Sequence, residues 1–391
     1  MEGLRSFQTS SWARLQLFGA VLSGISDSLL FPLQTLARSL LLFFSVTGPL
    51  HAADHCVILQ YHHISSETPA STSVTPALFK AHLDYLNETD FTLLSLESVV
   101  THILEKKPLP QRCAAITFDD AYRSIYEAAY PLLRRYDYPA TVFVSTRGID
   151  KKFGALMTWD QMRELSDHQI DFANHSASHS HLIRHQADES SKKWRERVVS
   201  DLREAESRLL EEVGRPTRLF AYPYGEFTPE LLEIISQLGL IGFGQQSGPA
   251  WFGSNPLVIS RFNMSTRYAD LAQFRMKVNT HPLPVVEKSS KSPLVSEDNN
   301  PPGLTVKLTP GRFDPQQIAC FASGEGKIPI SIRTETSSGL ISLTLKPSRP
   351  LRPGRSRYNC TAPHQQKKAY FWFSHLWIKP KADGSWYSES L

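Results

Sequence analysis

The sequence predicts an α/β domain built on a parallel sheet, followed by a small all-β domain with a sandwich-like pattern. Between about residues 55 and 285, short apolar runs alternate with helical patterns. This order is typical of a parallel sheet covered by helices, either open or closed into a barrel. After residue 303 the chain changes to short alternating strands separated by Pro and Gly clusters, which is the pattern of a β-sandwich.

The composition is that of an ordinary globular protein. The 391 residues are 41% apolar and 20% charged, with a formal net charge of +4, and the length suits one large and one small domain. This mild positive charge does not favour nucleic acid as a partner, although it suits a neutral or anionic polymer. The sequence leaves the oligomeric state open.

Residues 1–53 have the pattern of a targeting segment. An apolar run follows Arg38 and ends in small residues at Ala52 and Ala53, which resembles a secretory signal with its cleavage site. The apolar part is short for a membrane span. We therefore expect an exported protein, periplasmic or extracellular, with an uncleaved membrane anchor as the alternative.

The four cysteines suit an oxidising compartment. Cys320 and Cys360 lie in the same C-terminal region and could form a disulfide. Cys56 and Cys113 each begin an apolar, strand-like run. They either pair, if those strands are neighbours, or stay two buried thiols.

The α/β domain is expected to cover residues 54–286. Active sites in such folds gather at the carboxyl ends of the strands, so the polar residues that follow each strand are candidates for a site. The strand-like runs are Val57–Tyr61, Ala114–Phe118, Ala140–Val144 and Leu219–Ala221, and the helical patterns are Pro76–Asn87, Tyr122–Tyr136, Trp159–Ser166, Lys192–Val213 and Pro229–Leu238.

The remainder of the chain divides into a linker and the β domain. Residues 287–303 are rich in Ser, Lys, Pro and Asn and lack a hydrophobic period, which predicts a linker before a β domain at 304–391. In its last strand, Phe371, Phe373 and Trp377 share one face. We expect this face to form the core of the sandwich, with stacking on sugars as the alternative.

The first polar motif is the pair Asp119 and Asp120 after an apolar run. Neighbouring side chains on a strand alternate between faces, so both acids can face one site only if the strand ends there. The residues from Ala121 onward begin a helical pattern, so an end is expected. The alternative is that one aspartate merely caps that helix.

His175 and His179 form the second motif. Their spacing of four would place both on one face of a helical turn, although such pairs are often incidental, and His181 and His185 are further candidates. One carboxylate with two imidazoles forms a typical open metal site that leaves a position for water. A second carboxylate beside it can take a proton from that water.

Two more segments carry candidate residues. His62 ends the first strand, where a histidine is usually structural but, near a carboxylate, can serve as a general acid. Residues 221–225 include Pro223 and Gly225, which favour a tight turn. Such a turn can present a backbone N–H to a developing oxyanion, or it can be an ordinary turn.

Together these motifs resemble the polysaccharide deacetylases, the NodB-homology or carbohydrate esterase 4 family. Thr117–Asp120 matches the Thr-Phe-Asp-Asp motif, His175–His179 matches His-Ser/Thr-x-x-His, and Pro223–Gly225 matches Pro-Tyr-Gly. Order and spacing agree over roughly residues 55–280. The resemblance implies that the α/β domain is a distorted (β/α)7 barrel with deacetylase activity.

The resemblance also implies roles for the motif residues. Asp119 would be the catalytic base, and Asp120, His175 and His179 would bind a divalent metal. The backbone N–H of Tyr224 would help to stabilise the oxyanion. An Asp-His-His set favours zinc, with cobalt, nickel or iron(II) as alternatives.

The chain departs from the common pattern of the family at two places. Ala221 stands where the third motif usually carries an arginine, and residues 257–261 lack the histidine of the late Leu-x-Ile-His motif. Both departures resemble the branch that deacetylates poly-β-1,6-N-acetylglucosamine, whose acid histidine lies in an early Tyr-His motif, here Tyr61-His62. We therefore expect His62 to be the general acid and Arg261 to orient Asp119.

These expectations define a metal-dependent hydrolase that removes N-acetyl groups from a β-linked N-acetylglucosamine polymer or oligomer and releases acetate. Chitin oligomers, peptidoglycan and O-acetylated xylan are alternative substrates. An inactive carbohydrate-binding protein on the same scaffold is an alternative of another class, and the retention of both acids and both histidines argues against it. A two-carboxylate glycosidase is disfavoured, because adjacent aspartates can hardly flank a glycosidic bond with carboxyls about 5–9 Å apart.

Overall fold

The computed structural model describes residues 53–388 except for 215–216 and 266–267. The predicted targeting segment 1–53 therefore lies outside the described residues, apart from Ala53 itself. None of the helices within the described ranges is long and apolar enough to cross a membrane.

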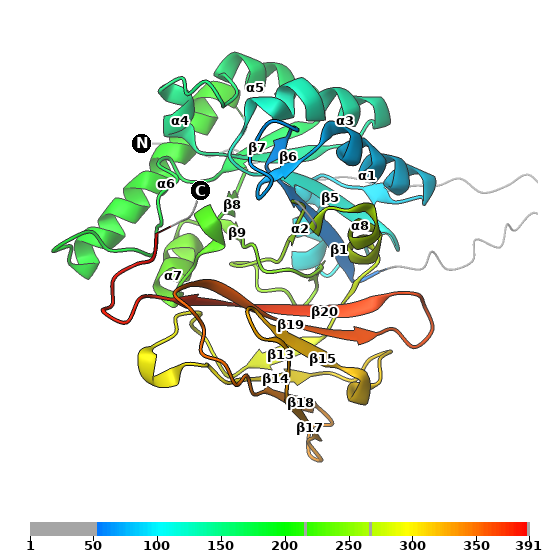
Figure 1. Ribbon diagram of the computed structural model, residues 1–391. Helices are drawn as coiled ribbons and strands as arrows, with labels where there is room; N and C mark the ends of the chain where they lie inside the picture. The colour runs from blue at the N-terminus through cyan, green and yellow to red at the C-terminus, as the bar shows by residue number, and fades with distance from the viewer. Residues whose placement is uncertain (1–52, 215–216, 266–267, 389–391) are drawn as a thin grey trace, which may run out of the picture. The chain divides into compact units, whose positions relative to one another are not determined.

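A curled, mainly parallel sheet forms the centre of the α/β region (Figure 1). Residues 259–263 contact both sides of this strand row, because Ile259 bridges to Phe243 of the last strand, β9, and β11 pairs with β1 near the other end. The prediction of a parallel α/β sheet is confirmed as a curled half-barrel, while the seven-unit count stays a prediction. Its row runs β10 (Ala250–Trp251), β1 (His55–Tyr61), β5 (Cys113–Phe118), β6 (Ala140–Val144), β7 (Ile170–Asn174), β8 (Leu219–Ala221) and β9 (Ile241–Phe243), with β4 (Thr92–Leu93) beside β5 and β11 (Phe262–Asn263) beside β1.

Helices cover the sheet, and their ends follow local sequence signals. The long helix α6 begins after Ser190, whose side chain accepts the N–H of Lys193, and ends at Gly214 in a left-handed conformation with φ 70°. The helices are α1 (Pro76–Glu88), α2 (Leu96–Leu104), α3 (Tyr130–Tyr136), α4 (Thr146–Asp150), α5 (Trp159–Ser166), α6 (Ser191–Val213), α7 (Pro229–Gln237) and α8 (Leu271–Val278).

The pattern Tyr122–Tyr136 does not form one regular α-helix. A π-helical segment, Ile125–Ala129, precedes α3. Pro131 lacks a backbone N–H and cannot donate to the carbonyl four residues earlier, so the helical ladder is interrupted there. The hydrophobic period alone does not reveal this change.

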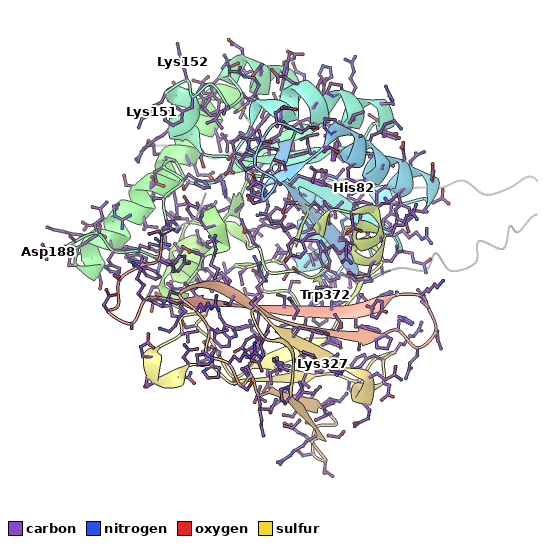
Figure 2. The ribbon with its side chains drawn as sticks, in the orientation of Figure 1. His82, Lys151, Lys152, Asp188, Lys327 and Trp372 are labelled. Carbon is purple, nitrogen blue, oxygen red and sulfur yellow. A yellow bond between two sulfur atoms is a disulfide. The ribbon has the colours of Figure 1, made fainter. Side chains whose placement is uncertain are left out.

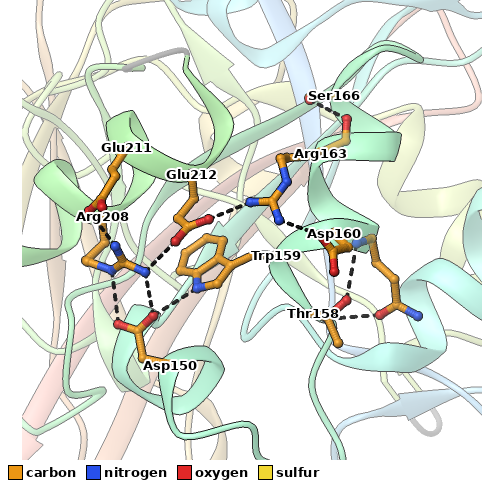
Figure 3. A network of polar contacts seen from close by, with 10 residues as sticks. Asp150, Thr158, Trp159, Asp160, Arg163, Ser166, Arg208, Glu211 and Glu212 are labelled. Carbon is orange, nitrogen blue, oxygen red and sulfur yellow. Dashed lines mark hydrogen bonds and ion pairs between the residues drawn. The ribbon is translucent and has the colours of Figure 1, made fainter.

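Figure 3 shows an ion-pair network that joins α4, α5 and α6. Arg208 Nη2 lies 2.8 Å from Asp150 Oδ1 and 2.6 Å from Glu212 Oε1, and Trp159 Nε1 donates to the same Asp150 oxygen at 2.8 Å. Arg163 Nη1 contacts Glu212 at 2.5 Å. Each exposed pair contributes little to stability, but the network links three helices on the outer surface.

The C-terminal region consists of two sheets that share one apolar core. Figure 1 shows both sheets, which together support the sandwich-like prediction. The first sheet contains β12 (His281–Pro282), β20 (Tyr370–Lys379), β19 (Gly354–Pro363), β15 (Ala319–Ala322) and β16 (Gly326–Ile328), and the second contains β13 (Val285–Lys288), β14 (Leu304–Leu308), β18 (Ile341–Leu345) and β17 (Ile330–Thr334).

The β region begins earlier than its composition suggests. β12 pairs with β20, and β13 pairs with β14, so strands are present before and inside the range 287–303 that was expected to be a linker. A short 3-10 turn, Glu297–Asn299, follows in the same range. Strands of two to four residues carry too few alternations for a period to be recognised in the sequence.

Both cysteine pairs form disulfides. Cys56 and Cys113 join the neighbouring parallel strands β1 and β5, so the disulfide alternative applies to this pair. Cys320 and Cys360 lie opposite each other on β15 and β19. Each bridge ties segments that are far apart in the sequence.

The aromatic residues of β20 face two different environments. Phe371 and Trp377 are 8% and 2% exposed within the core between the two sheets, as expected for a core face. Trp372, labelled in Figure 2, lies on the opposite face and packs against Phe262 of the α/β region at 5.6 Å between ring centroids. β20 therefore connects the β region with the α/β region.

Candidate active site

Both acidic residues of the first motif face one site because β5 ends at Phe118. Asp120 and Ala121 have φ values of 71° and 55°, so the chain turns sharply after Asp119. Left-handed backbone is unusual for residues other than glycine, and such strain is common at functional sites. The turn removes the strand alternation that would otherwise separate the two carboxylates.

Asp119 is completely buried and held by charge-assisted hydrogen bonds. Arg261 donates from Nη1 to Oδ1 at 2.7 Å and from Nη2 to Oδ2 at 2.8 Å, and Gln60 Nε2 donates to Oδ2 at 2.6 Å. Burial raises the pKa of Asp119, but the Arg261 charge and nearby histidines outweigh it and hold the pKa below its usual range. The carboxylate is therefore ionised near neutral pH. It accepts hydrogen bonds from Arg261 and Gln60, which is not the hydrogen bonding of a residue that caps a helix.

Arg261 is itself fully buried and fixed from several sides. Its Nε donates to the carbonyl of Gly244 at 3.1 Å, and its guanidinium lies 5.1 Å from the centroid of the Phe143 ring. A buried arginine and a buried carboxylate compensate each other's desolvation only when they pair well. The expected contact between Arg261 and Asp119 is thus present in the structure.

Asp120, His175 and His179 form a group whose candidate ligand atoms lie within 4.8 Å of one another. Asp120 Oδ1 lies 3.3 Å from His175 Nε2 and 3.0 Å from His179 Nε2. Burial raises the pKa of Asp120, but the charge of His179 and the close contacts with both histidines hold it well below its usual range. An ionised carboxylate is the form that binds a metal.

The donor set fits a divalent cation. His175 Nδ1 donates to the carbonyl of Ala221 at 2.8 Å, because a carbonyl oxygen can only accept. The Nε2 atom of a neutral His175 then presents its lone pair to the Asp120 oxygen. That contact is favourable when a cation lies between the two atoms, and a carbonyl partner on the other ring nitrogen is the usual support for a metal-binding histidine.

His175 and His179 converge through a loop, and the expectation of a helical turn is wrong. Ser176 and His179 have φ values of 63° and 52°. The Ser176 hydroxyl accepts the N–H of His179 at 2.9 Å, and the Asn174 side chain accepts the N–H of Ser176 at 2.7 Å. These short polar side chains close a tight loop after β7 where a helix would need regular backbone bonds.

The two further candidate histidines lie outside the ligand group. His181 Nδ1 contacts Glu226 Oε2 at 2.8 Å, and its ring stacks on Tyr224 at 3.7 Å with an interplanar angle of 9°. His185 stacks on Trp194. The structure therefore selects among histidines that spacing alone does not distinguish.

Tyr224 lies beside the ligand group in a strained turn. It has φ 60° and ψ 2°, and its ring centroid is 4.8 Å from that of His179. The left-handed conformation costs a non-glycine residue about 1–2 kcal/mol. Gly225 follows with φ 69°, and a Cβ there would approach Gln245 to 2.7 Å, so only glycine fits. Two successive positive φ angles set this turn apart from an ordinary one.

His62 follows β1 and is 8% exposed. Its charge is among the smaller influences that lower the pKa values of Asp119 and Asp120, after burial, which raises both, and the larger effects of Arg261 and His179. No described residue forms a hydrogen bond with His62 Nδ1. Because the N–H of Asp119 donates to the carbonyl of Tyr61 at 2.9 Å, the backbone of this early histidine lies close to Asp119.

A cavity of about 280 Å³ opens beside Asp120 and His179. Tyr122, Lys151 and Phe153 line it, and Phe153 is 57% exposed. Figure 2 labels Lys151 just after α4. The volume is near the lower limit of small-ligand sites.

Gln60 is the residue of the Asp119 environment that sequence reasoning missed. It is completely buried on β1 and contacts Asp119. A single amide inside an otherwise apolar strand was the available signal, because a buried polar side chain needs a partner.

Residues 106–242 match the family model for polysaccharide deacetylase. The protein YxkH of Bacillus subtilis is 28% identical over 182 residues, which are 46% of this chain and 61% of YxkH. The poly-beta-1,6-N-acetyl-D-glucosamine N-deacetylase of Staphylococcus aureus is 27% identical over 210 residues, 52% of this chain and 72% of that protein. The chain thus spans less than two thirds of the length of YxkH.

Solved structures show the same fold for the α/β region. The Streptococcus pyogenes deacetylase PplD in complex with acetate has a TM-score of 0.52 and 23% identity, covering 57% of this chain and 98% of its own. IcaB from Ammonifex degensii has a TM-score of 0.52 and 22% identity, covering 58% of this chain and 98% of its own.

The curled parallel sheet, with its acids and histidines at the carboxyl edge, has the fold of these solved structures. Residues 106–242 thus form a polysaccharide deacetylase domain by their match to the family model, and this region is similar to the NodB-homology or carbohydrate esterase 4 family.

Proposed function

We propose that the protein is a metal-dependent hydrolase that removes N-acetyl groups from a β-linked N-acetylglucosamine polysaccharide or oligosaccharide and releases acetate. The observation that carries this proposal is the buried pair of Asp119 and Arg261 directly beside the group of Asp120, His175 and His179. The activity for which the Staphylococcus aureus relative is named and the early position of His62 favour a β-1,6-linked substrate.

Asp120, His175 and His179 would hold the metal, and their chemistry favours zinc over cobalt, nickel or iron(II). When bound, the ion supplies Lewis acidity that polarises the acetyl carbonyl and makes water a better nucleophile. The residues around it must then orient the substrate and move protons.

Asp119 accepts a proton from the attacking water. Its lowered pKa keeps it ionised, and Arg261 and Gln60 fix its orientation. The Tyr224 N–H donates to the oxygen that becomes negative as water adds to the acetyl carbon. His62 gives a proton to the amine nitrogen while the carbon–nitrogen bond breaks. The products are acetate and a free amine on the sugar.

We also propose that the protein is exported and acts on a polymer outside the cytoplasm. Two disulfides suit an oxidising compartment. The apolar run before Ala53 suits a secretory signal. An uncleaved segment would instead attach the enzyme to a membrane.

Acetate release from linkage-defined substrates tests the proposal. The panel contains β-1,6- and β-1,4-linked N-acetylglucosamine oligomers, peptidoglycan and O-acetylated xylan, with the metal content of the protein measured. We expect release from the β-1,6 oligomer, loss of it in Asp119→Asn and His175→Ala, and full release in the control His185→Ala. Release by Asp119→Asn at the parent rate would refute the assigned base.

The same panel separates the remaining alternatives. Preference for the β-1,4 oligomer, peptidoglycan or xylan would keep the mechanism and change the substrate. Tight glycan binding by a metal-free protein, without acetate release from any substrate, would favour a carbohydrate-binding protein instead.

A further inference from the structure

Glu226 is a buried carboxylate that the proposed chemistry does not use. It is 2% exposed and lies directly after the Tyr224 turn. It contacts His181 Nδ1 at 2.8 Å and accepts from the Tyr387 hydroxyl at 2.5 Å. Arg355 Nη1 lies 3.9 Å away. Partners from the loop after β7, from β19 and from the C-terminal segment therefore meet at one carboxylate.

Arg355 also contacts the Tyr224 turn directly. Its Nη1 donates to the carbonyl of Tyr224 at 3.1 Å, and its guanidinium lies 5.4 Å from the centroid of the Tyr224 ring. The next N–H, that of Gly225, donates to the Tyr222 carbonyl at 2.8 Å. The peptide unit after Tyr224 is thus held at both ends, and one end is held by a residue of the β region.

Glu226 connects the same contacts to the metal-binding loop. It holds the His181 ring, which stacks on Tyr224, and the Tyr224 ring in turn lies beside His179. A shift of Glu226 would therefore move both the strained turn and a ligand histidine.

Tyr387, in the C-terminal segment, is held by further contacts besides its hydrogen bond to Glu226. Arg184 lies 4.8 Å from the Tyr387 ring centroid and donates to the Tyr387 carbonyl at 3.2 Å. Tyr387 also belongs to an apolar cluster that includes Trp194 of α6 and Ile234 of α7. In Figure 1 the red segment that follows β20 runs toward these helices. Tyr387 thus reaches Glu226 from a fixed position.

We propose that Arg355 and Tyr387 are positioning residues for the deacetylation, acting through the Tyr224 carbonyl and Glu226 to hold the oxyanion-binding turn and the His179 loop. The inference rests on the proposed function. It assigns a catalytic contribution to the β region, because both residues lie outside the family match at 106–242.

The test compares Arg355→Ala, Arg355→Lys and Tyr387→Phe with the control Arg349→Ala, which changes an exposed arginine of the β region. We expect kcat for acetate release to fall about 10- to 100-fold in Arg355→Ala, with a smaller change in KM. Tyr387→Phe should lose less. Arg355→Lys keeps one donor and should recover part of the rate, as should added guanidinium with Arg355→Ala.

Backbone hydrogen exchange over residues 219–228, followed by mass spectrometry, gives a second readout that needs no substrate. Exchange should be faster in Arg355→Ala than in Arg349→Ala, with the melting temperature and metal content close to those of the parent. Parent-like kcat, or a rate loss that only follows the unfolded fraction, would overturn the inference.

The two proposals can fail separately. A parent protein that releases acetate from no substrate contradicts the proposed function, while faster exchange at the turn still shows that Arg355 holds it. Unchanged exchange together with unchanged kcat contradicts the positioning role alone.

Discussion

The α/β region and the β region bury different kinds of side chain. At the carboxyl edge of the curled sheet, Asp119 and Arg261 are both completely buried. The core between the two sheets of the β region consists of aliphatic and aromatic side chains with the Cys320–Cys360 disulfide. The carboxyl edge of the curled sheet buries charged groups that can react, whereas the core between the two β sheets buries apolar groups that pack.

This difference indicates that activity depends mainly on the α/β region and that the apolar core of the β region mainly contributes stability. A buried ion pair contributes little net stability, because the desolvation of both charges offsets their attraction. Burial of apolar side chains is the main stabilising contribution to folding. Substitutions at the carboxyl edge of the sheet should therefore change the reaction, whereas substitutions in the β core should change the free energy of unfolding.

The largest expected effect is the loss of a proposed metal ligand. His175→Ala should lower acetate release by at least about 10³-fold, since a bound ion would contribute several kcal/mol to the proposed reaction. Elemental analysis should show a lower metal content, while the melting temperature stays near that of the metal-free parent. Parent-like metal content and rate would place the metal elsewhere.

The second largest expected effect is the loss of His62, the early histidine. His62→Gln keeps a polar side chain but cannot hand over a proton near neutral pH, so kcat should fall by about 10²- to 10⁴-fold with the metal content unchanged. His102→Gln, on α2, serves as the control. If both variants retain the parent kcat, the departing amine takes its proton from another group.

A substitution in the apolar core of the β region should change the free energy of unfolding and leave the reaction rate unchanged. Leu343 on β18 is completely buried, and Leu343→Ala should lower the free energy of unfolding by about 2–5 kcal/mol, as measured by urea denaturation. The rate per folded molecule should not change. Ser342→Ala, on the same strand, should have little effect on either quantity.

A large fall in kcat for fully folded Leu343→Ala would contradict the expectation that the β core affects stability and not the reaction. It would also indicate that the β region controls the site through more than Arg355 and Tyr387.

The smallest expected effect depends on pH and concerns His82 on α1. It is completely buried, its Nε2 donates to the carbonyl of Ala269, and Nδ1 accepts from the Tyr61 hydroxyl. Burial, with a smaller contribution from Lys277, lowers its pKa to about 4, although Asp270 and the bond to Ala269 oppose this. The unfolded chain gains this proton near pH 6.5, so stability present above that pH is lost as pH falls toward 4, by roughly 2–3 kcal/mol.

Thermal melts between pH 7 and pH 4 measure this effect. In His82→Gln the melting temperature should fall less between pH 7 and pH 4 than in the parent. Part of the fall should remain, because burial also lowers the pKa values of His281 and His375 to about 3. An identical pH profile in the parent and in His82→Gln would contradict the assignment.

The sequence was sufficient for features that are local in the chain. The pair Asp119-Asp120 and the histidines 175 and 179 stand in contiguous motifs, so their residue types could be recognised directly. The alternation of strands and helices predicted the parallel sheet because each element carries its own hydrophobic pattern.

Features that depend on distant contacts or on unusual backbone were missed. The loop that brings His175 and His179 together needs positive φ angles, which their spacing does not reveal. Gln60 could have been noticed as a polar residue in an apolar strand. Arg355, which is 131 residues from Tyr224, has no motif around it, and only the folded chain shows the contact.

The position of Tyr387 has a consequence for biosynthesis. Tyr387 lies 161 residues after Glu226, far beyond the last motif of the candidate site at Pro223–Gly225. Because Glu226 accepts a hydrogen bond from this distant residue, a nascent chain that has not reached Tyr387 contains every motif of the candidate site but not the complete support of Glu226. Full activity should therefore appear only after the chain has been synthesised and folded past Tyr387.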